Sequence, residues 1–163
     1  LDNTSNWARQ SQKWPGDLQQ GQAEVRAIKT ALADQVGKVN VGVLEFTTDG
    51  TANQDGAFVR FDMQELTADS YTVLSAHLDT IFDNINDPDE KRNSGTPYGN
   101  LMRDVYSYLA GGGQSHNGSG TLASIADADA YAAQYSLFSS PLSSDNICSN
   151  INIIFILEYH LKH

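Results

Sequence analysis

The feature that decides the fold is the stretch VNVGVLEFT at residues 39–47. Its apolar residues follow one another so closely that both faces of the extended chain are largely apolar. A strand of this kind is typical of a sheet covered by helices on both sides, whereas a strand with one face in water alternates apolar and polar residues. The sequence therefore predicts a buried strand inside an α/β domain.

Apolar residues recur at helical spacing on both sides of this strand. They predict a first helix from Gln20 to a C-terminal stop at Gly37, and a second helix around residues 74–85. A third helix is expected to begin with Thr96 as its N-cap and Pro97 in its first turn, and to stop at residues 111–113. On this third helix Tyr106 and Tyr108 point to opposite sides, so one is expected in the core and one at the surface.

Two more short strands complete the expected set, at residues 57–61 and 151–157. Because helices and strands alternate, the chain is expected to form a mostly parallel sheet whose ligand sites lie at the carboxyl ends of the strands. We expect one domain over residues 1–163, with a Gly/Ser/Ala-rich insertion at about 111–150 and a short helix near 126–135. Neither end has the strand or cap that such a domain requires, so we expect a fragment of a larger protein, truncated at both ends.

Composition restricts the possible partners. The formal charge is −10 and the isoelectric point is near 4.5, so phosphates of nucleic acids and anionic lipids are repelled. No segment approaches the ~18 apolar residues of a membrane span. The polar residues are mostly uncharged, which suits an exported protein. Cys148 is the only cysteine, so it is either a buried apolar residue or the half of a bridge to a partner.

The first loop of the chain carries the best candidates for chemistry. In an extended segment alternate residues project the same way, so Asp2, Thr4 and Asn6 present a carboxylate, a hydroxyl and an amide together. Thr96, from a second loop, adds another hydroxyl. Such oxygen ligands suit the hard cations Mg²⁺ and Ca²⁺. The alternative is that Asp2 and Thr96 only cap a turn and a helix, which is a common role for these residue types.

Other candidates are weaker. The acidic loop at residues 83–90 lacks the central glycine and distal glutamate of a calcium loop, so it is expected to be a solvated helix exit. Trp7 and Trp14 flank the first loop and are expected to pack beneath it or to contact a receptor. No Gly-x-Ser-x-Gly elbow or phosphate loop is apparent. The sequence therefore predicts a protein that is not an enzyme.

Several motifs together resemble one family. Residues 2–6, DNTSN, are similar to the Asp-x-Ser-x-Ser loop of von Willebrand A domains, and residues 95–99, GTPYG, look like the second motif of their metal-ion-dependent adhesion site. The order of DNTSNW, VNVGV, GAFVRF, SGTPYG, YSYLAG and NIIFI most resembles PilY-like proteins of type IV pili. Thr4 and Asn6 replace the two serines of the first motif, and Glu158 or Tyr159 stands where a third, acidic motif is usual.

This resemblance implies a fold, a site and a role. The fold would be the von Willebrand A type, a Rossmann-like three-layer sandwich with a mostly parallel central sheet and helices on both faces. The site would be a Mg²⁺ or Ca²⁺ ion held by Asp2, Thr4, Asn6 and Thr96. The role would be adhesion to host or abiotic surfaces and support of pilus biogenesis and twitching motility, at the extracellular pilus tip after export across the outer membrane. The rival is a metal-free structural or mechanosensory module that docks onto minor pilins.

Overall fold

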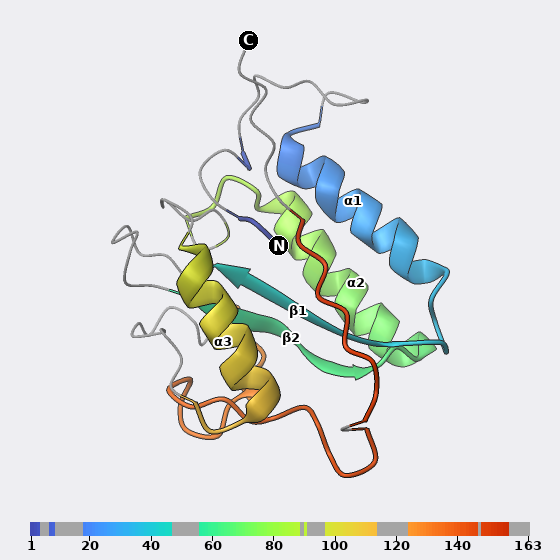
Figure 1. Ribbon diagram of the computed structural model, residues 1–163. Coiled ribbons are helices and arrows are strands. Elements are labelled where there is room, and N and C mark those ends of the chain that lie inside the picture. Colours follow the sequence, from blue (N-terminus) through green and yellow to red (C-terminus); the bar gives the residue numbers. More distant parts are fainter. Residues whose placement is uncertain are drawn as a thin grey trace.

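The structure is a computed structural model that describes residues 1–3, 7–8, 18–46, 56–88, 90, 97–113, 124–146 and 148–156. The described residues form the helices α1 (Gln20–Ala33), α2 (Ala68–Asp83) and α3 (Tyr98–Ala110), the strands β1 (Asn40–Phe46) and β2 (Ala57–Glu65), and a short 3₁₀ helix, η2 (Ala128–Ala130). Figure 1 shows the two strands at the centre, between α3 and the pair α1 and α2.

The predicted parallel sheet is wrong. Within the described residues the sheet has two strands, and β1 pairs with β2 in antiparallel register, from Asn40 opposite Glu65 to Phe46 opposite Ala57. The physical reason is that the two strands follow each other directly in the chain, with only residues 47–56 between them. Consecutive strands with a short connection pair as a hairpin, whereas a parallel pair needs a long crossover. The chain is therefore a small α/β protein and not a Rossmann-like sandwich.

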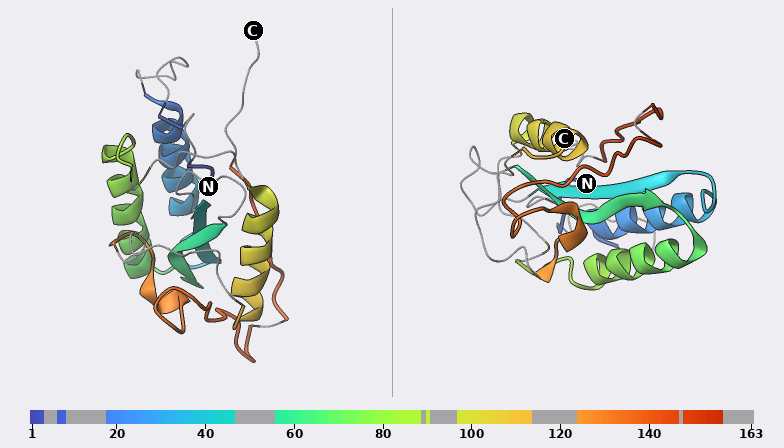
Figure 2. Two further views of the ribbon diagram at one scale, coloured as in Figure 1. Left: turned by 90° about the vertical axis from the view of Figure 1, so that its left-hand side faces the viewer. Right: turned by 90° about the horizontal axis from the view of Figure 1, so that it is seen from below.

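The predicted last strand is also wrong over the part described. Residues 151–156 are extended but join no ladder, and Ile154 is 80% exposed. This segment lies on the same side of the sheet as α3 (Figure 2). One backbone hydrogen bond fixes its end, from the amide of Asp2 to the carbonyl of Ile156 at 3.0 Å. The run of apolar residues predicted a strand here. A strand, however, also requires a neighbouring strand to which its backbone can hydrogen-bond.

The helices were mostly predicted correctly. α1 ends at Ala33, before Gly37, and Gly37 takes a positive φ of 75° in the turn that follows. The N-cap of α3 is Pro97 rather than the predicted Thr96, while Gly111 ends the helix with a φ of 76° as expected. The helix predicted near residues 126–135 is reduced to η2.

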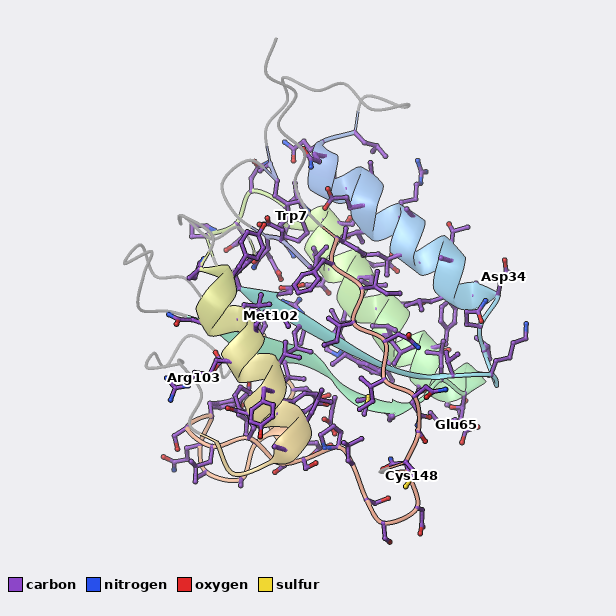
Figure 3. All side chains as sticks on the ribbon, viewed as in Figure 1. Trp7, Asp34, Glu65, Met102, Arg103 and Cys148 are labelled. Atoms are coloured by element: carbon purple, nitrogen blue, oxygen red, sulfur yellow. The ribbon has the colours of Figure 1, made fainter. Side chains whose placement is uncertain are left out.

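The core is divided by the sheet. On one side α1, α2 and β2 enclose the larger cluster, which includes the fully buried Trp7 (Figure 3). Gly21, in the first turn of α1, packs against the Trp7 ring so closely that a Cβ at this position would lie 2.1 Å from the indole Nε1. On the other side, α3 covers the sheet with two smaller clusters, one around Phe46 and one around Tyr108 that also includes Ala130 of η2.

Tyr108 also connects α3 to β2 through its hydroxyl. The backbone amide of Met63 donates to this hydroxyl at 2.7 Å, and the hydroxyl donates to the Asp62 carboxylate at 2.6 Å. Tyr108 is 2% exposed and Tyr106 is 73% exposed, so the prediction that they face opposite sides is confirmed.

Replacing Tyr108 with phenylalanine is expected to lower the free energy of unfolding by about 1–3 kcal/mol, because a half-buried Met63 amide would lose its acceptor. The matched control is Tyr106→Phe on the same helix, which is expected to change stability by less than about 0.5 kcal/mol. Urea unfolding followed by circular dichroism measures both. Equal losses in the two variants would contradict the structural role of the Tyr108 hydroxyl.

Candidate functional site

The candidate site lies where β1 ends and β2 begins. Three separate segments meet there, namely residues 1–3, the start of α3, and the end of the extended segment 151–156. Asp2 is 2% exposed, and its Oδ2 accepts a hydrogen bond from the hydroxyl of Tyr98 at 2.9 Å. Its backbone amide donates to Ile156. A buried carboxylate thus stands at the meeting point of the three segments.

Asn3 holds the first segment against the end of the hairpin. Its side-chain amide accepts from the backbone amide of Phe46 at 3.1 Å and donates to the Phe46 carbonyl at 3.3 Å. It also donates to the carbonyl of Glu90 at 3.1 Å. The Asn3 side chain therefore forms hydrogen bonds with both the N–H and the C=O group of Phe46, the last residue of β1, as a neighbouring strand would. Asp2, next to it in sequence, is held in place by this contact.

A buried ion pair lies close to this contact. Arg60 and Glu90 form a bidentate salt bridge, with both N–O distances at 2.9 Å, and both side chains are at most 5% exposed. Glu45 is fully buried as well. Burial alone would lower the pKa of Arg60, but the carboxylates of Glu45 and Glu90 outweigh it and raise that pKa. The positive charge of Arg60 therefore interacts favourably with two buried carboxylates, Glu45 and Glu90.

Of the four residues predicted to hold a metal ion, the structure describes one. Asp2 is described, whereas Thr4, Asn6 and Thr96 lie outside the described residues, as do Glu158 and Tyr159. Tyr98, which bonds Asp2, is two positions after Thr96. In the described part of the chain, no group of three or more His, Cys, Asp or Glu side chains is arranged to hold a metal ion.

Two other predictions need correction. Cys148 is exposed, so it is not a buried apolar residue; it lies far from Trp7 (Figure 3). The acidic loop after α2 is not simply solvated, because Glu90 within it is buried against Arg60. Trp7 packs in the core, as one of the two expectations had it, rather than at the surface. Trp14 lies outside the described residues.

Sequence reasoning missed the group formed by Glu45, Arg60 and Glu90. A signal was present, since Glu45 interrupts the apolar run of the first strand and Arg60 interrupts the run Phe58, Val59, Phe61 in the second. Charged residues inside apolar strands are seldom buried unless they are paired. The partner Glu90 carried no such signal, because it stands in a loop among other acids.

Glu24, on α1, is electrostatically coupled to the candidate site. Burial raises its pKa to about 7, the hydrogen bond from Gln20 opposes this shift, and the charge of Asp2 adds to it. A carboxyl group with a raised folded-state pKa stabilises the fold only while it is protonated. The stability should therefore fall as the pH rises from about 4.5 to about 7.

Glu24→Gln is expected to remove this pH dependence. The variant should equal the parent protein near pH 4 and exceed it by about 2 kcal/mol at pH 8, a figure reduced from the full shift because Glu24 is partly solvated. Chemical unfolding across this pH range measures the difference. The exposed Glu65→Gln is the control and should keep the parent's pH profile. A Glu24→Gln profile that is parallel to the parent's would contradict the raised pKa.

Comparisons with known proteins do not assign the chain to a family. No family model, no curated protein and no solved structure matches it. Among the described residues, no helix combines the length and the apolar character that crossing a membrane requires. The resemblance to PilY-like proteins therefore rests on the sequence motifs alone.

Proposed function

We propose that the chain is an adhesion and pilus biogenesis module of an extracellular type IV pilus tip, and that it binds a surface ligand through a divalent cation. The ion, Mg²⁺ or Ca²⁺, would be held by Asp2, Thr4, Asn6 and Thr96. The support from sequence is the ordered set of motifs that resemble PilY-like proteins. Minor pilins and a surface receptor would be the partners.

The observation that carries the proposal is the environment of Asp2. A buried carboxylate is costly unless it is paired, hydrogen-bonded or bound to a cation. Asp2 supplies the hard oxygen donor that Mg²⁺ and Ca²⁺ prefer, and its bond with Tyr98 brings the first loop next to the segment that follows Thr96. The described donor of the proposed set therefore fits the ion chemically.

The function follows from coordination. A cation held by one carboxylate and three neutral oxygens keeps a net positive charge and room for further ligands. When bound, the ion would accept an acidic side chain from the surface ligand. Tyr98 would orient Asp2, and Asn3 would hold the loop to β1. The chain's strong negative charge would raise the local concentration of cations.

The test is cation binding to the intact chain and to Asp2→Asn. The parent is expected to release or absorb heat and to gain thermal stability in millimolar Mg²⁺ or Ca²⁺, with about 1.4 kcal/mol of stabilisation at ten times the Kd. Asp2→Asn should lose this gain, whereas Asp79→Asn, an exposed control of equal charge change, should keep it. No heat and no thermal shift in the parent would refute the cation site.

A second readout uses Glu24 as a reporter. Since the charge of Asp2 contributes to the raised pKa of Glu24, a cation bound at Asp2 should lower this pKa below about 7. Carboxyl ¹³C NMR titration with and without the metal ion measures the change. If Mg²⁺ and Ca²⁺ leave the Glu24 titration unaltered, the ion does not bind beside Asp2.

The rival function is a metal-free module that docks onto minor pilins. The observation in its favour is that Asp2 already accepts a bond from Tyr98 and is almost fully buried, as an anchor for the loop would be. Replacing Asp2 and Thr96 with alanine in the parent pilus protein separates the two functions. Loss of adhesion with pili intact supports the cation site, whereas unaltered adhesion supports the rival.

A further inference from the structure

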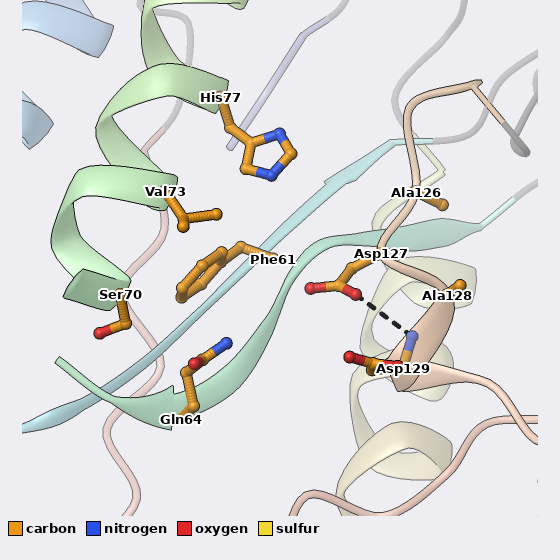
Figure 4. A pocket seen from close by; sticks show the side chains of 9 residues that line it. All are labelled: Phe61, Gln64, Ser70, Val73, His77, Ala126, Asp127, Ala128 and Asp129. Carbon is orange, nitrogen blue, oxygen red and sulfur yellow. Dashed lines mark hydrogen bonds between the residues drawn. The ribbon is translucent and has the colours of Figure 1, made fainter. Parts of the chain in front are cut away.

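A pocket of about 380 Å³ lies over the second half of β2, and Asp2 is not among the residues that line it (Figure 4). One wall is formed by α2, through Val73 and His77, and the opposite wall by Asp127 and Asp129 around η2. Phe61 of β2 lies between them, and its ring meets the His77 ring edge to face at a centroid distance of 6.4 Å. The pocket thus has one mainly apolar side and one acidic side.

The acidic side is fixed in position by backbone contacts. The Asp127 carboxylate accepts hydrogen bonds from the amides of Asp62 at 2.9 Å and Asp129 at 3.2 Å. Among the described residues, no lysine or arginine forms an ion pair with Asp62, Asp127 or Asp129. Three carboxylates are therefore close together without a basic side chain to balance them.

The three carboxylates repel one another electrostatically. Burial raises the pKa of Asp62, the hydrogen bond from the Tyr108 hydroxyl opposes this shift, and the charges of Asp127 and Asp129 add to the rise. Burial lowers the pKa of His77 below its usual value and the positive charge of Arg60 lowers it further, which together outweigh the opposing charges of Asp127 and Glu90. His77 is therefore mainly neutral at pH 7 and supplies no compensating charge. A cation that entered the pocket would relieve the repulsion among the acids.

The size and chemistry of the pocket select the kind of cation. Its volume is at the lower end of the range for ligand pockets, which suits one long side chain better than a larger molecule. A metal ion is less well matched, because the described carboxylates, Asp62, Asp127 and Asp129 included, form no group of three placed so that it could hold one. The exposed Val73 offers apolar surface for an aliphatic stem, as long basic side chains require when their charged end is held elsewhere.

We propose that this pocket binds a basic side chain, lysine or arginine, of a partner polypeptide. Its stem lies along the exposed Val73, over the buried ring of Phe61, and its charged end lies between Asp127 and Asp129. Asp129 is exposed and has room to meet the cation, while Asp127 is held by its backbone contacts and gives the site a fixed geometry. The site is independent of the cation proposed at Asp2.

The test is an NMR titration of the intact chain with short blocked peptides. Acetyl-Gly-Arg-Gly-amide and acetyl-Gly-Lys-Gly-amide are expected to give saturating shifts at Val73, His77 and residues 126–129, with a Kd in the millimolar range. Acetyl-Gly-Gln-Gly-amide, the neutral control, should give none. Asp129→Asn should weaken the binding of the basic peptides by about 3- to 5-fold, as expected for one partly solvated charge pair.

Asp79→Asn is the matched control variant. Asp79 is an exposed acid on α2 that pairs with Lys29, so its replacement changes the net charge by the same amount as Asp129→Asn. Binding in this variant should equal that of the parent. Equal weakening in both variants, shifts spread over the whole surface, or equal shifts with the neutral peptide would show non-specific attraction and overturn the proposal. None of these outcomes depends on cation binding at Asp2.

Discussion

Replacing Arg60 with methionine is expected to destabilise the protein by about 3–5 kcal/mol. Methionine keeps much of the buried volume but removes the charge, so Glu45 and Glu90 would remain buried without their cation. Breaking a buried ion pair on one side is costly in this way because the desolvated charge left behind has no partner. The loss should grow with rising pH, since the two carboxylates can escape the cost only by taking up protons.

The control for Arg60→Met is the exposed ion pair between Lys29 and Asp79, 2.6 Å apart. Lys29→Met removes the same kind of charge from a solvated pair and should cost less than about 1 kcal/mol. Guanidinium unfolding of both variants at pH 5 and pH 8 gives the comparison. If Arg60→Met cost no more than Lys29→Met at pH 8, the buried ion pair would have no structural importance.

Replacing Gly21 with alanine is expected to destabilise the protein by about 3 kcal/mol. The added Cβ would lie 2.1 Å from the Nε1 and 2.2 Å from the Cδ1 of Trp7, far inside normal contact distances. Trp7 is fully buried and cannot move into solvent without opening the core. Overpacking of a close-packed interior forces side chains and backbone to shift. Loss of this packing should also appear as a change in the tryptophan fluorescence spectrum.

The control for Gly21→Ala is Gly99→Ala. Both glycines are the second residue of their helix, Gly21 in α1 and Gly99 in α3, but a Cβ on Gly99 meets nothing within 4 Å. Alanine favours a helix over glycine by up to about 1 kcal/mol, so Gly99→Ala should be neutral or slightly stabilising. Thermal unfolding of the two variants tests this contrast. Equal behaviour of the two would mean that the Trp7 ring does not lie against Gly21.

The sequence indicated the elements better than their arrangement. Periodicity at residues such as Val25, Leu74 and Leu101 reports which side of a helix is apolar, and that is a local property. Pairing between strands is not local. The apolar run at 39–47 correctly predicted a strand, but it carried no information on which neighbour would pair with it. The parallel sheet was inferred from the order of elements, and the direct connection from β1 to β2 decides otherwise.

The candidate site was predictable in one part. Asp2 was singled out by the spacing of polar oxygens, and it does occupy a buried position where separate segments meet. The bond from Tyr98 was not predictable, because a tyrosine at the start of a helix commonly faces solvent. The pocket between α2 and η2 was equally hidden, since Asp127 and Asp129 lie in a stretch for which the sequence indicated a Gly/Ser/Ala-rich insertion with a short helix, but no binding site.

The hydrogen bond between Asp2 and Ile156 can form only after almost all of residues 1–156 have been synthesised, so it affects the order in which the segments fold. A ribosome would produce the first segment long before its partner, and the bonds of Leu1 to Leu44 and of Asn3 to Glu90 span large parts of the chain as well. Closing such long loops costs entropy before the contacts can form, which slows folding. The first residues should therefore dock late in folding.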